Sequence, residues 1–369
     1  MRYCKEFTMK QTDAFRSADL VSSLTASLAQ AVTRPIKIME VCGSHTMSIF
    51  HHGIRDLLPA DMQLLSGPGC PVCVTPQGYI DNAIGLVHSQ DVILASFGDM
   101  LRVPGNRSSL LKEKAAGQDI RVLYSPLDAV EIAATNPQRQ VVFLGVGFET
   151  TAPVVAVTIL EAAKRNLDNF SVFSAHKLVP PAMEALCADD ALQVDGFLCP
   201  GHVSTVIGLE PYRFLAEKHH KPAVIAGFEI VDILHALLLI AEMLRQDKPA
   251  AVNAYPRAVA DAGNPTAREI LNRLFMPTDS IWRGLGLIRE SGLQIRPEFS
   301  RFDAAVRFNL KETETQTPNG CSCGDILRGL KTPPQCALYK KACTPQTPMG
   351  ACIVSSEGTC AAYHKYIVD

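Results

Sequence analysis

Short apolar runs alternate with longer helix-like patterns through most of this chain, and that alternation constrains its fold more than any other feature. The runs predict strands at Ile36–Val41, Val92–Ala95, Arg121–Tyr124, Val141–Leu144, Ser171–Ser174, Gly196–Leu198 and Ala223–Ala226. The intervening patterns predict helices at Ser108–Ala116, Pro126–Thr135, Ala152–Arg165, Pro180–Ala188, Ser204–Lys218 and Val231–Arg245. Such alternation is typical of parallel α/β units. We therefore expect an α/β protein with two or more doubly wound parallel-sheet units.

The length of 369 residues exceeds what one hydrophobic core usually supports, so more than one domain is expected. We predict a first α/β domain at 1–135, a second at 136–250 and a C-terminal domain at 251–369. From about Gly320 the chain becomes rich in Cys, Pro, Gly and Lys. A segment of this composition cannot build a large core unaided, so we expect a bound metal group to supply cross-links there.

Charge and hydropathy exclude two classes of partner. The formal net charge is -2 and no basic stripe is present, which argues against nucleic acid. The most apolar run, Ile233–Leu244, is about half the length of a membrane span and reads as a buried helix. Because the first residues contain no secretory apolar core, we expect a cytoplasmic protein without a membrane partner.

Twelve cysteines carry the strongest functional signal. Cys4, Cys187 and Cys199 stand alone and are expected to be inert thiols. The other nine form an early group and a late group. In a reducing compartment, clustered cysteines more often bind metal or perform redox chemistry than form structural disulfides.

The early group contains a C-x-x-C pair, Cys70 and Cys73, after a stiff Gly-Pro-Gly. Two thiols at this spacing can close a disulfide or chelate a soft metal ion. A zinc half-site is the alternative, but no second pair follows at zinc-finger spacing. We favour a redox-active or iron-binding pair.

Cys42 ends a predicted strand and precedes two small residues and His45. The small residues allow close approach, so we expect a ligand to reach the Cys42 sulfur, with His45 orienting or protonating it. The alternative is a packed thiol beside a satisfied core histidine. Cys42, Cys70 and Cys73 are the candidate metal ligands of the early group.

Polar motifs follow five of the predicted strands. Because ligands bind at the carboxyl edge of open α/β sheets, these motifs are expected to share one cleft. Glu149 and His202 are the preferred candidates for a catalytic role. Asp99, Thr150 and Glu229 are weaker candidates. The alternative for these motifs is helix capping or loop structure, with Thr150 and Thr151 ahead of one helix and Ser204 opening another.

The late group contains four separated thiols that fit either zinc or a [4Fe–4S] cluster: Cys323, Cys336, Cys343 and Cys360. Zinc sites favour closely paired cysteines, whereas wide spacing suits a larger cluster, which we therefore favour. Cys321 and Cys352 are two further candidates.

Ten motifs together resemble the HypD family of [NiFe]-hydrogenase maturation factors, from the first strand to Cys360. They are IMEVCGSHT, GPGCPVC, FGDMLRVPG, GFETTAP, PGHVS, AGFE, DAGN, WRGLG, RFDA and VSSEGTC. One departure is visible, because the family usually reads CGGHT and this chain has Ser44 in place of the second glycine. Serine is small and could add a hydrogen bond there.

The resemblance implies a scaffold that assembles an Fe(CN)2CO unit with the small chaperone HypC and receives cyanide from HypE. It implies that Cys42 is the iron ligand, with His45 beside the iron. It implies that Cys70 and Cys73 are a redox pair, and that Cys323, Cys336, Cys343 and Cys360 hold a [4Fe–4S] cluster. The set does not require Cys321 or Cys352, which puts a role for either in doubt.

From these roles we hypothesise that electrons pass from the cluster through the Cys70–Cys73 pair to iron at Cys42. Two alternatives remain open. One is an iron–sulfur-dependent thiol–disulfide oxidoreductase, for which Cys42 is dispensable. The other is a zinc-stabilised nucleotide-binding α/β protein.

Overall fold

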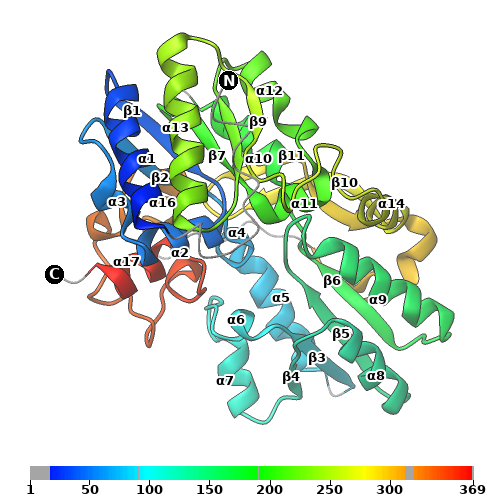
Figure 1. Cartoon of the computed structure of the whole chain (residues 1–369). Helices are drawn as coiled ribbons and strands as arrows, with labels where there is room; N and C mark the ends of the chain where they lie inside the picture. The colour runs from blue at the N-terminus through cyan, green and yellow to red at the C-terminus, as the bar shows by residue number, and fades with distance from the viewer. Residues whose placement is uncertain (1–16, 90, 190, 312–319, 368–369) are drawn as a thin grey trace.

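The computed structural model describes residues 17–89, 91–189, 191–311 and 320–367 and shows an α/β protein with two parallel sheets (Figure 1). This confirms the predicted fold class, and cysteines gather in the C-terminal region. Cys4 lies outside the described residues. Among the described helices, none is long and apolar enough to cross a bilayer. The apolar run at 233–244 forms part of α13 (Ile230–Gln246), whose inner face is buried.

The larger sheet has five parallel strands in the order β2-β1-β7-β8-β9. Their bounds are β1 Ile36–Glu40, β2 Met62–Ser66, β7 Gly196–Pro200, β8 Ala223–Ala226 and β9 Ala251–Asn253. One face is covered by α1 (Ala18–Ala31) and α13, and the other by α10 (Val179–Cys187) and α12 (Arg213–Glu217). Because both faces are covered, the central strands are almost wholly buried.

The smaller sheet has four parallel strands in the order β4-β3-β5-β6. Their bounds are β3 Val92–Ser96, β4 Ile120–Val122, β5 Gln140–Gly145 and β6 Phe170–Ser174. On one face lie α8 (Leu127–Thr135) and α9 (Ala152–Lys164), and on the other lies α5 (Gln77–Val87). Both sheets are therefore doubly wound.

The sheets interleave along the chain. The larger sheet takes β1 and β2 from before the four-stranded sheet and β7 to β9 from after it. Within the four-stranded sheet, β3 and β4 precede residue 135 and β5 and β6 follow it. The division into sheets therefore does not follow the expected boundary between residues 135 and 136.

All seven predicted strands are present within two residues of their expected ends, but four others were missed. β2 reads Met-Gln-Leu-Leu-Ser and lacks the β-branched residues that mark strands. β9 has three residues. The antiparallel pair β10 (Phe275–Trp282) and β11 (Gly286–Ile295) contains Pro277 and several charged residues, which hide its strand pattern.

The predicted helix Ser204–Lys218 is wrong. The structure has α11 (Gly201–Ile207), the 3-10 turn η3 (Glu210–Tyr212) and then α12. The break falls at Gly208, whose φ of 76° is left-handed and cannot continue a helix. Ser204 lies inside α11, where its hydroxyl donates to Pro200 O, and does not open a helix.

The remaining helices are short and lie mostly in connections. They are α2 Gly43–His51, α3 Ile54–Leu57, α4 Pro71–Val74, α6 Gly98–Leu101, α7 Leu110–Ala115, α14 Pro265–Leu274, η4 Pro297–Phe302, α15 Ala304–Arg307, α16 Cys323–Leu327, η5 Pro333–Gln335, η6 Ala351–Ile353 and α17 Thr359–Tyr366. In the C-terminal segment, α17 packs against α2 and η6 packs against α4. This segment therefore docks on both early thiol motifs (Figure 1).

Each sheet has a switch point where the strand order reverses, so that the connections from the two neighbouring strands run to opposite sides of the sheet. In the larger sheet it lies between β1 and β7, and in the smaller sheet between β3 and β5. Ligands of open α/β sheets bind beyond the carboxyl ends of such strands. Cys42 and His202 follow the first pair of strands, and Asp99 and Glu149 follow the second. The fold thus places four predicted site residues at the two positions best suited to binding.

Candidate functional site

Cys42 lies directly after β1 and caps the N-terminus of α2. The Gly43 N–H donates to Gly69 O at 2.8 Å, and a Cβ on Gly69 would lie 2.2 Å from the Cys42 nitrogen. Glycine is therefore required where the Gly-Pro-Gly-Cys strand end passes over Cys42. Cys42 is only 7% exposed. The expectation of an open sulfur is therefore wrong for the chain alone.

The surroundings of Cys42 keep its thiol protonated. Burial raises the pKa of Cys42 to about 12, and the carboxylates of Glu357 and Glu40 raise it as well. The backbone N–H groups of His45 and Ser44, at the start of α2, act in the opposite direction. A thiolate therefore forms at this position when a cation replaces the proton.

Glu40 is a buried acid beside Cys42 that the sequence interpretation missed. Its Oε1 accepts from the Thr46 hydroxyl at 2.5 Å and its Oε2 accepts from the Cys42 N–H at 3.2 Å. Burial raises the pKa of Glu40 to about 7, against the effect of these hydrogen bonds. The carboxyl group can therefore gain or lose a proton near neutral pH, two residues from the candidate metal ligand.

His45 is fully buried and faces the ends of β7 and β8. Its Nε2–H donates to Gly227 O at 2.9 Å, which leaves Nδ1 as a bare acceptor with no partner among the described residues. Burial lowers the pKa of His45 to about 4, so the ring is neutral at pH 7. Phe228 separates His45 from the exposed His202, with ring centroids 4.7 Å and 4.0 Å away. The ends of β1, β7 and β8 thus meet here.

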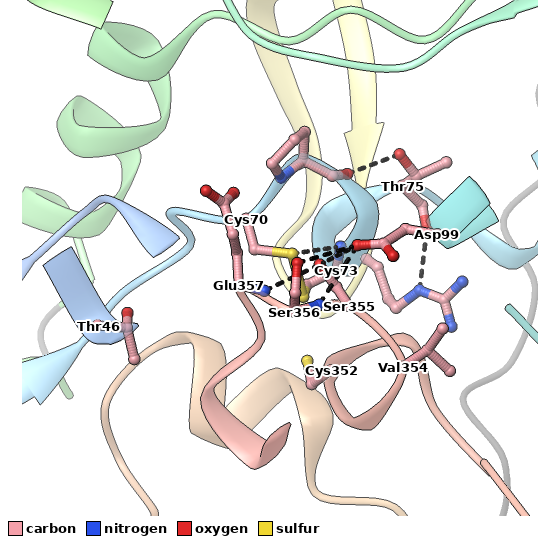
Figure 2. Close-up of a disulfide and its surroundings, with 12 residues drawn as sticks. Thr46, Cys70, Cys73, Thr75, Asp99, Cys352, Val354, Ser355, Ser356 and Glu357 are labelled. Atoms are coloured by element: carbon pink, nitrogen blue, oxygen red, sulfur yellow. Dashed lines mark hydrogen bonds between the residues drawn. A yellow bond between two sulfur atoms is a disulfide. The ribbon is translucent and has the colours of Figure 1, made fainter. Parts of the chain in front are cut away.

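Cys70 and Cys73 form a disulfide across the single turn of α4. Both sulfur-bearing residues are buried, and they share an apolar cluster with Phe148 and Trp282. Figure 2 shows the disulfide flanked by Asp99 and the segment that carries Ser355 to Glu357, with Cys352 close by. The predicted pair therefore lies close to Cys352 of the late group.

The loop from Val354 to Gly358 connects these parts. Its Ser355 hydroxyl and Ser356 N–H donate to Asp99, which follows β3. Its Glu357 Oε1 accepts from the Ser44 hydroxyl at 2.7 Å, so the departure at Ser44 does add a hydrogen bond (Figure 2 shows the position of Glu357). One loop therefore touches both sheet edges.

Six cysteines line a single apolar cavity of the C-terminal segment: Cys321, Cys323, Cys336, Cys343, Cys352 and Cys360. The sequence interpretation selected four of them and left Cys321 and Cys352 without a role. Within the described ranges, no three donor side chains converge closely enough for a single metal ion. Thiols spread around a cavity suit a multi-iron cluster better than one zinc ion.

The chemistry of this pocket fits a cationic group. Burial and neighbouring sulfurs raise the pKa values of Cys321, Cys343 and Cys360 above the ordinary value. Several thiolates cannot lie together in an apolar cavity unless a metal compensates their charge. The Sγ atoms of Cys323 and Cys352 are 3.2 Å apart, so these two thiols face each other inside the pocket.

Glu149 follows β5 and is 2% exposed. Its Oε1 accepts from the Val179 N–H at the start of α10, and its Oε2 has no partner among the described residues. Burial raises the pKa of Glu149 to about 7. Burial raises the pKa of Tyr212, and Cys199, Glu149 and Cys42 raise it further.

The weaker candidates have mainly structural contacts. Glu229 forms a capping box with Asp232 at the start of α13. Thr151 precedes α9 but its side chain makes no capping hydrogen bond, since its hydroxyl donates to Phe148 O. Thr150 is half-buried. Cys199 is fully buried and Cys187 partly buried, in keeping with inert thiols.

Two acids near Cys42 were missed although both lie in motifs that the sequence shows. Glu40 is in IMEVC and Glu357 is in VSSEGTC. Their signal was an acidic residue next to a cysteine motif, but only the fold brings Glu357 to Ser44, 313 positions away along the chain.

Comparison with known proteins gives a consistent result. The model of the family HypD, described as "Hydrogenase formation hypA family", matches residues 18–367. "Hydrogenase maturation factor HypD2" of Bradyrhizobium diazoefficiens is 46% identical over 368 residues, with 97% of each chain covered. "Hydrogenase maturation factor HypD" of Escherichia coli (strain K12) is 42% identical over 366 residues, covering 97% of this chain and 98% of that one. The motifs, the fold and the sequence identity over almost the whole length agree. The chain belongs to the HypD family of hydrogenase maturation factors.

Proposed function

We propose that this chain is the scaffold on which the Fe(CN)2CO unit of a [NiFe]-hydrogenase is assembled. In this proposal it works in the cytoplasm, pairs with a HypC-type chaperone and accepts cyanide from a HypE-type donor. Cys42 holds the iron during assembly, as the resemblance to the family implies. Cys70 and Cys73 supply electrons, and a [4Fe–4S] cluster is the resident cofactor of the late cysteine pocket.

The observation that carries the proposal is the position of one C-terminal segment. It contributes to the late cysteine pocket and contacts the motifs of both Cys42 and the Cys70–Cys73 pair. Cys352 and Cys360 line the late pocket. Between them, Glu357 bonds to Ser44, two residues after Cys42. The preceding turn η6 packs on α4, which holds the Cys70–Cys73 disulfide. The few residues from Cys352 to Cys360 therefore connect the proposed electron-supplying groups with the proposed iron site.

The chemistry at Cys42 suits a soft, low-spin iron that carries cyanide and carbon monoxide, since thiolates are strong soft donors. The Cys42 thiol loses its proton when iron binds, and Glu40 lies within a hydrogen bond of the Cys42 backbone to take part in that transfer. Because the neutral thiol is favoured in the absence of metal, Cys42 can also release its cargo. The sulfur must become accessible for loading, and in this proposal the Ser44–Glu357 contact opens to admit the iron.

A [4Fe–4S] cluster in the late pocket would be a source of single electrons. Opening the Cys70–Cys73 disulfide takes two electrons and two protons and gives two thiols, so this pair can store two electrons for the iron site. Both cysteines lie in the same apolar cluster as Cys323 and Cys352. That shared packing supports short-range electron transfer between pocket and disulfide.

The identity of the fourth cluster ligand is open between two neighbours. The resemblance assigns Cys323, with Cys336, Cys343 and Cys360. Cys321 lines the same cavity, and Cys323 faces Cys352 sulfur to sulfur. Anaerobic iron and sulfide analysis of Cys321→Ala and Cys323→Ala distinguishes the two sets, because only the true ligand is needed for a full complement of four irons.

The test is anaerobic co-purification with the chaperone and the cyanide donor, followed by infrared spectroscopy. Wild type should show metal-bound cyanide and carbonyl stretches. Cys42→Ala should lose them, whereas the control Cys199→Ala, which removes a buried core thiol, should keep them. If Cys42→Ala retains all the cyanide and carbonyl stretches, the scaffold proposal is contradicted.

The disulfide itself favours a second candidate, an iron–sulfur-dependent thiol–disulfide oxidoreductase. Burial of Cys70 and Cys73 weighs against direct attack on a protein disulfide, since the attacking sulfur must be accessible. If Cys42→Ala supports normal hydrogenase maturation while Cys70→Ala does not, the oxidoreductase replaces the scaffold.

A further inference from the structure

Arg283 is a buried arginine in the tight turn between β10 and β11. It is 7% exposed. Its backbone N–H donates to Val74 O at 2.7 Å, and its Nε–H donates to Thr75 O at 2.8 Å. Both acceptors immediately follow Cys73. The guanidinium group is therefore fixed to the segment that carries the disulfide.

The charge of Arg283 has no counterpart among protein carboxylates. Within the described parts of the chain, no Asp or Glu forms an ion pair with it, and its Nη2 has no hydrogen-bond partner. A buried cation without an anion is costly, so such a group normally faces negative charge. Among the described residues, no acidic side chain therefore compensates the charge of Arg283.

The same turn contacts the late cysteine pocket from the other side. Gly284 has a φ of 79°, and a Cβ there would lie 2.4 Å from the Cα of Gly324. The backbone of the turn thus rests directly on the residue after Cys323. Gly284 follows Arg283 directly, so the turn that carries the guanidinium group adjoins the Cys323 end of the pocket.

We propose that Arg283 is a positioning residue of the electron path, whose guanidinium, anchored on Thr75 O, holds a positive charge against the cysteine pocket and favours the reduced state of the group bound there. Adding one electron makes that group more negative by one charge, with no bond formed or broken. A nearby fixed cation lowers the free energy of the more negative state. This inference rests on the proposed iron–sulfur cofactor and deepens it.

The experiment is an anaerobic redox titration of the purified full chain with dithionite, followed by electron paramagnetic resonance of the reduced cluster. Arg283→Gln removes the charge and keeps a hydrogen-bonding side chain. We expect its reduced-to-oxidised ratio at a fixed potential to fall roughly tenfold, which is a shift of about 59 mV for a one-electron couple. Arg283→Lys keeps the charge and should stay close to wild type.

Two further variants serve as controls for folding and for charge removal elsewhere in the chain. Arg283→Met is a second neutral variant should the buried amide of glutamine impair folding. Arg139→Gln is the matched control, because Arg139 also donates to a backbone carbonyl, Val92 O, but is paired with Asp119 in the four-stranded sheet. Its potential should equal that of wild type.

The outcomes separate this inference from the proposed function. A wild-type chain without an iron–sulfur signal overturns the cofactor and this inference with it. A wild-type signal whose potential is unchanged in Arg283→Gln or Arg283→Met overturns the inference alone. Equal shifts in Arg283→Lys and Arg283→Gln also overturn it, since the effect would then follow side-chain shape and not charge.

Discussion

The Cys42 site and the late cysteine pocket use the same donor atom in opposite ways. Cys42 is one thiol at the edge of a five-stranded sheet, fixed by backbone hydrogen bonds of β1, α2 and Gly69. The pocket collects six thiols from a segment with only short helices. The first site is shaped by backbone contacts of the protein, whereas in our proposal a bound metal group neutralises and cross-links the second.

This difference suits a transient and a permanent metal site. In the proposed function, the single thiol of Cys42, with its raised pKa, binds iron and gives it back, while several thiolates around one cavity retain a cluster. The two regions meet at the loop that bonds Ser44 to Glu357. This arrangement has two requirements: the stability of one site does not depend on the other, and the two sites are connected in function. The predictions below test both.

The largest expected effect is on cofactor content. Cys336→Ala and Cys343→Ala should lose bound iron and acid-labile sulfide almost completely, because each removes one of the thiols that line the cavity. Cys42→Ala should retain the full content, as should the control Cys187→Ala. Anaerobic iron and sulfide analysis measures both. Loss of the cluster in Cys42→Ala would show that the two metal sites are not separate.

A smaller but substantial effect is expected at Gly69. Gly69→Ala places a methyl group on the backbone of Cys42, and we expect it to destabilise the chain by about 3 kcal/mol. Gly85→Ala is the control, because nothing lies within 4 Å of its added Cβ and it is in helix α5. That variant should be neutral or slightly stabilising. Urea unfolding measures both, and equal effects would contradict a Cys42 site built by close backbone contact.

The buried acid at the edge of the second sheet should make stability depend on pH. Burial raises the pKa of Glu149 to about 7 from 4.5, so the folded chain holds a proton that the unfolded chain releases. This contribution is complete below pH 4.5 and is lost as the pH rises through 7.

Glu149→Gln keeps the neutral form and the Val179 hydrogen bond. Relative to wild type, it should gain about 2 kcal/mol between pH 5 and pH 8. Urea unfolding at the two pH values measures the gain. A difference between the variants that does not change with pH would mean that Glu149 is ionised in the folded chain.

The smallest effect concerns the bond between the two regions. A double-mutant cycle of Ser44→Ala and Glu357→Gln should give a coupling energy of about 1 kcal/mol, the usual value for a hydrogen bond to a charged group that is only partly buried. A coupling near zero would remove the Ser44–Glu357 contact from the account. Ser44→Gly restores the usual family motif and also removes the hydroxyl. In the cycle with Glu357→Gln it should therefore give the same coupling energy as Ser44→Ala.

Much of the fold could be predicted because the central strands are short apolar runs that end at Gly, Pro, Ser or Cys. Gly196–Leu198 and Ala223–Ala226 are examples, and the α/β alternation around them predicted parallel sheets. The interleaving of the two sheets could not be predicted, because the pairing of β1 with β7 joins distant segments and leaves no local signal. β2 was missed because leucine and methionine do not mark a strand.

The thiol motifs were visible in the sequence, but their environment was not. Gly69 packs on the backbone of Cys42 and Glu357 packs on Gly43, and Arg283 lies in a turn that is distant in sequence from every cysteine. The resemblance to the family assigned Cys323 and not Cys321, although both line the pocket. Such information exists only in the folded chain.

The most direct test of the central claim is Mössbauer spectroscopy of the iron-57-enriched complex of this chain with its chaperone, for wild type and Cys42→Ala side by side. Wild type should show two kinds of iron, a [4Fe–4S] cluster and a separate low-spin iron, and Cys42→Ala should show the cluster alone. A low-spin iron signal of undiminished intensity in Cys42→Ala would contradict the account.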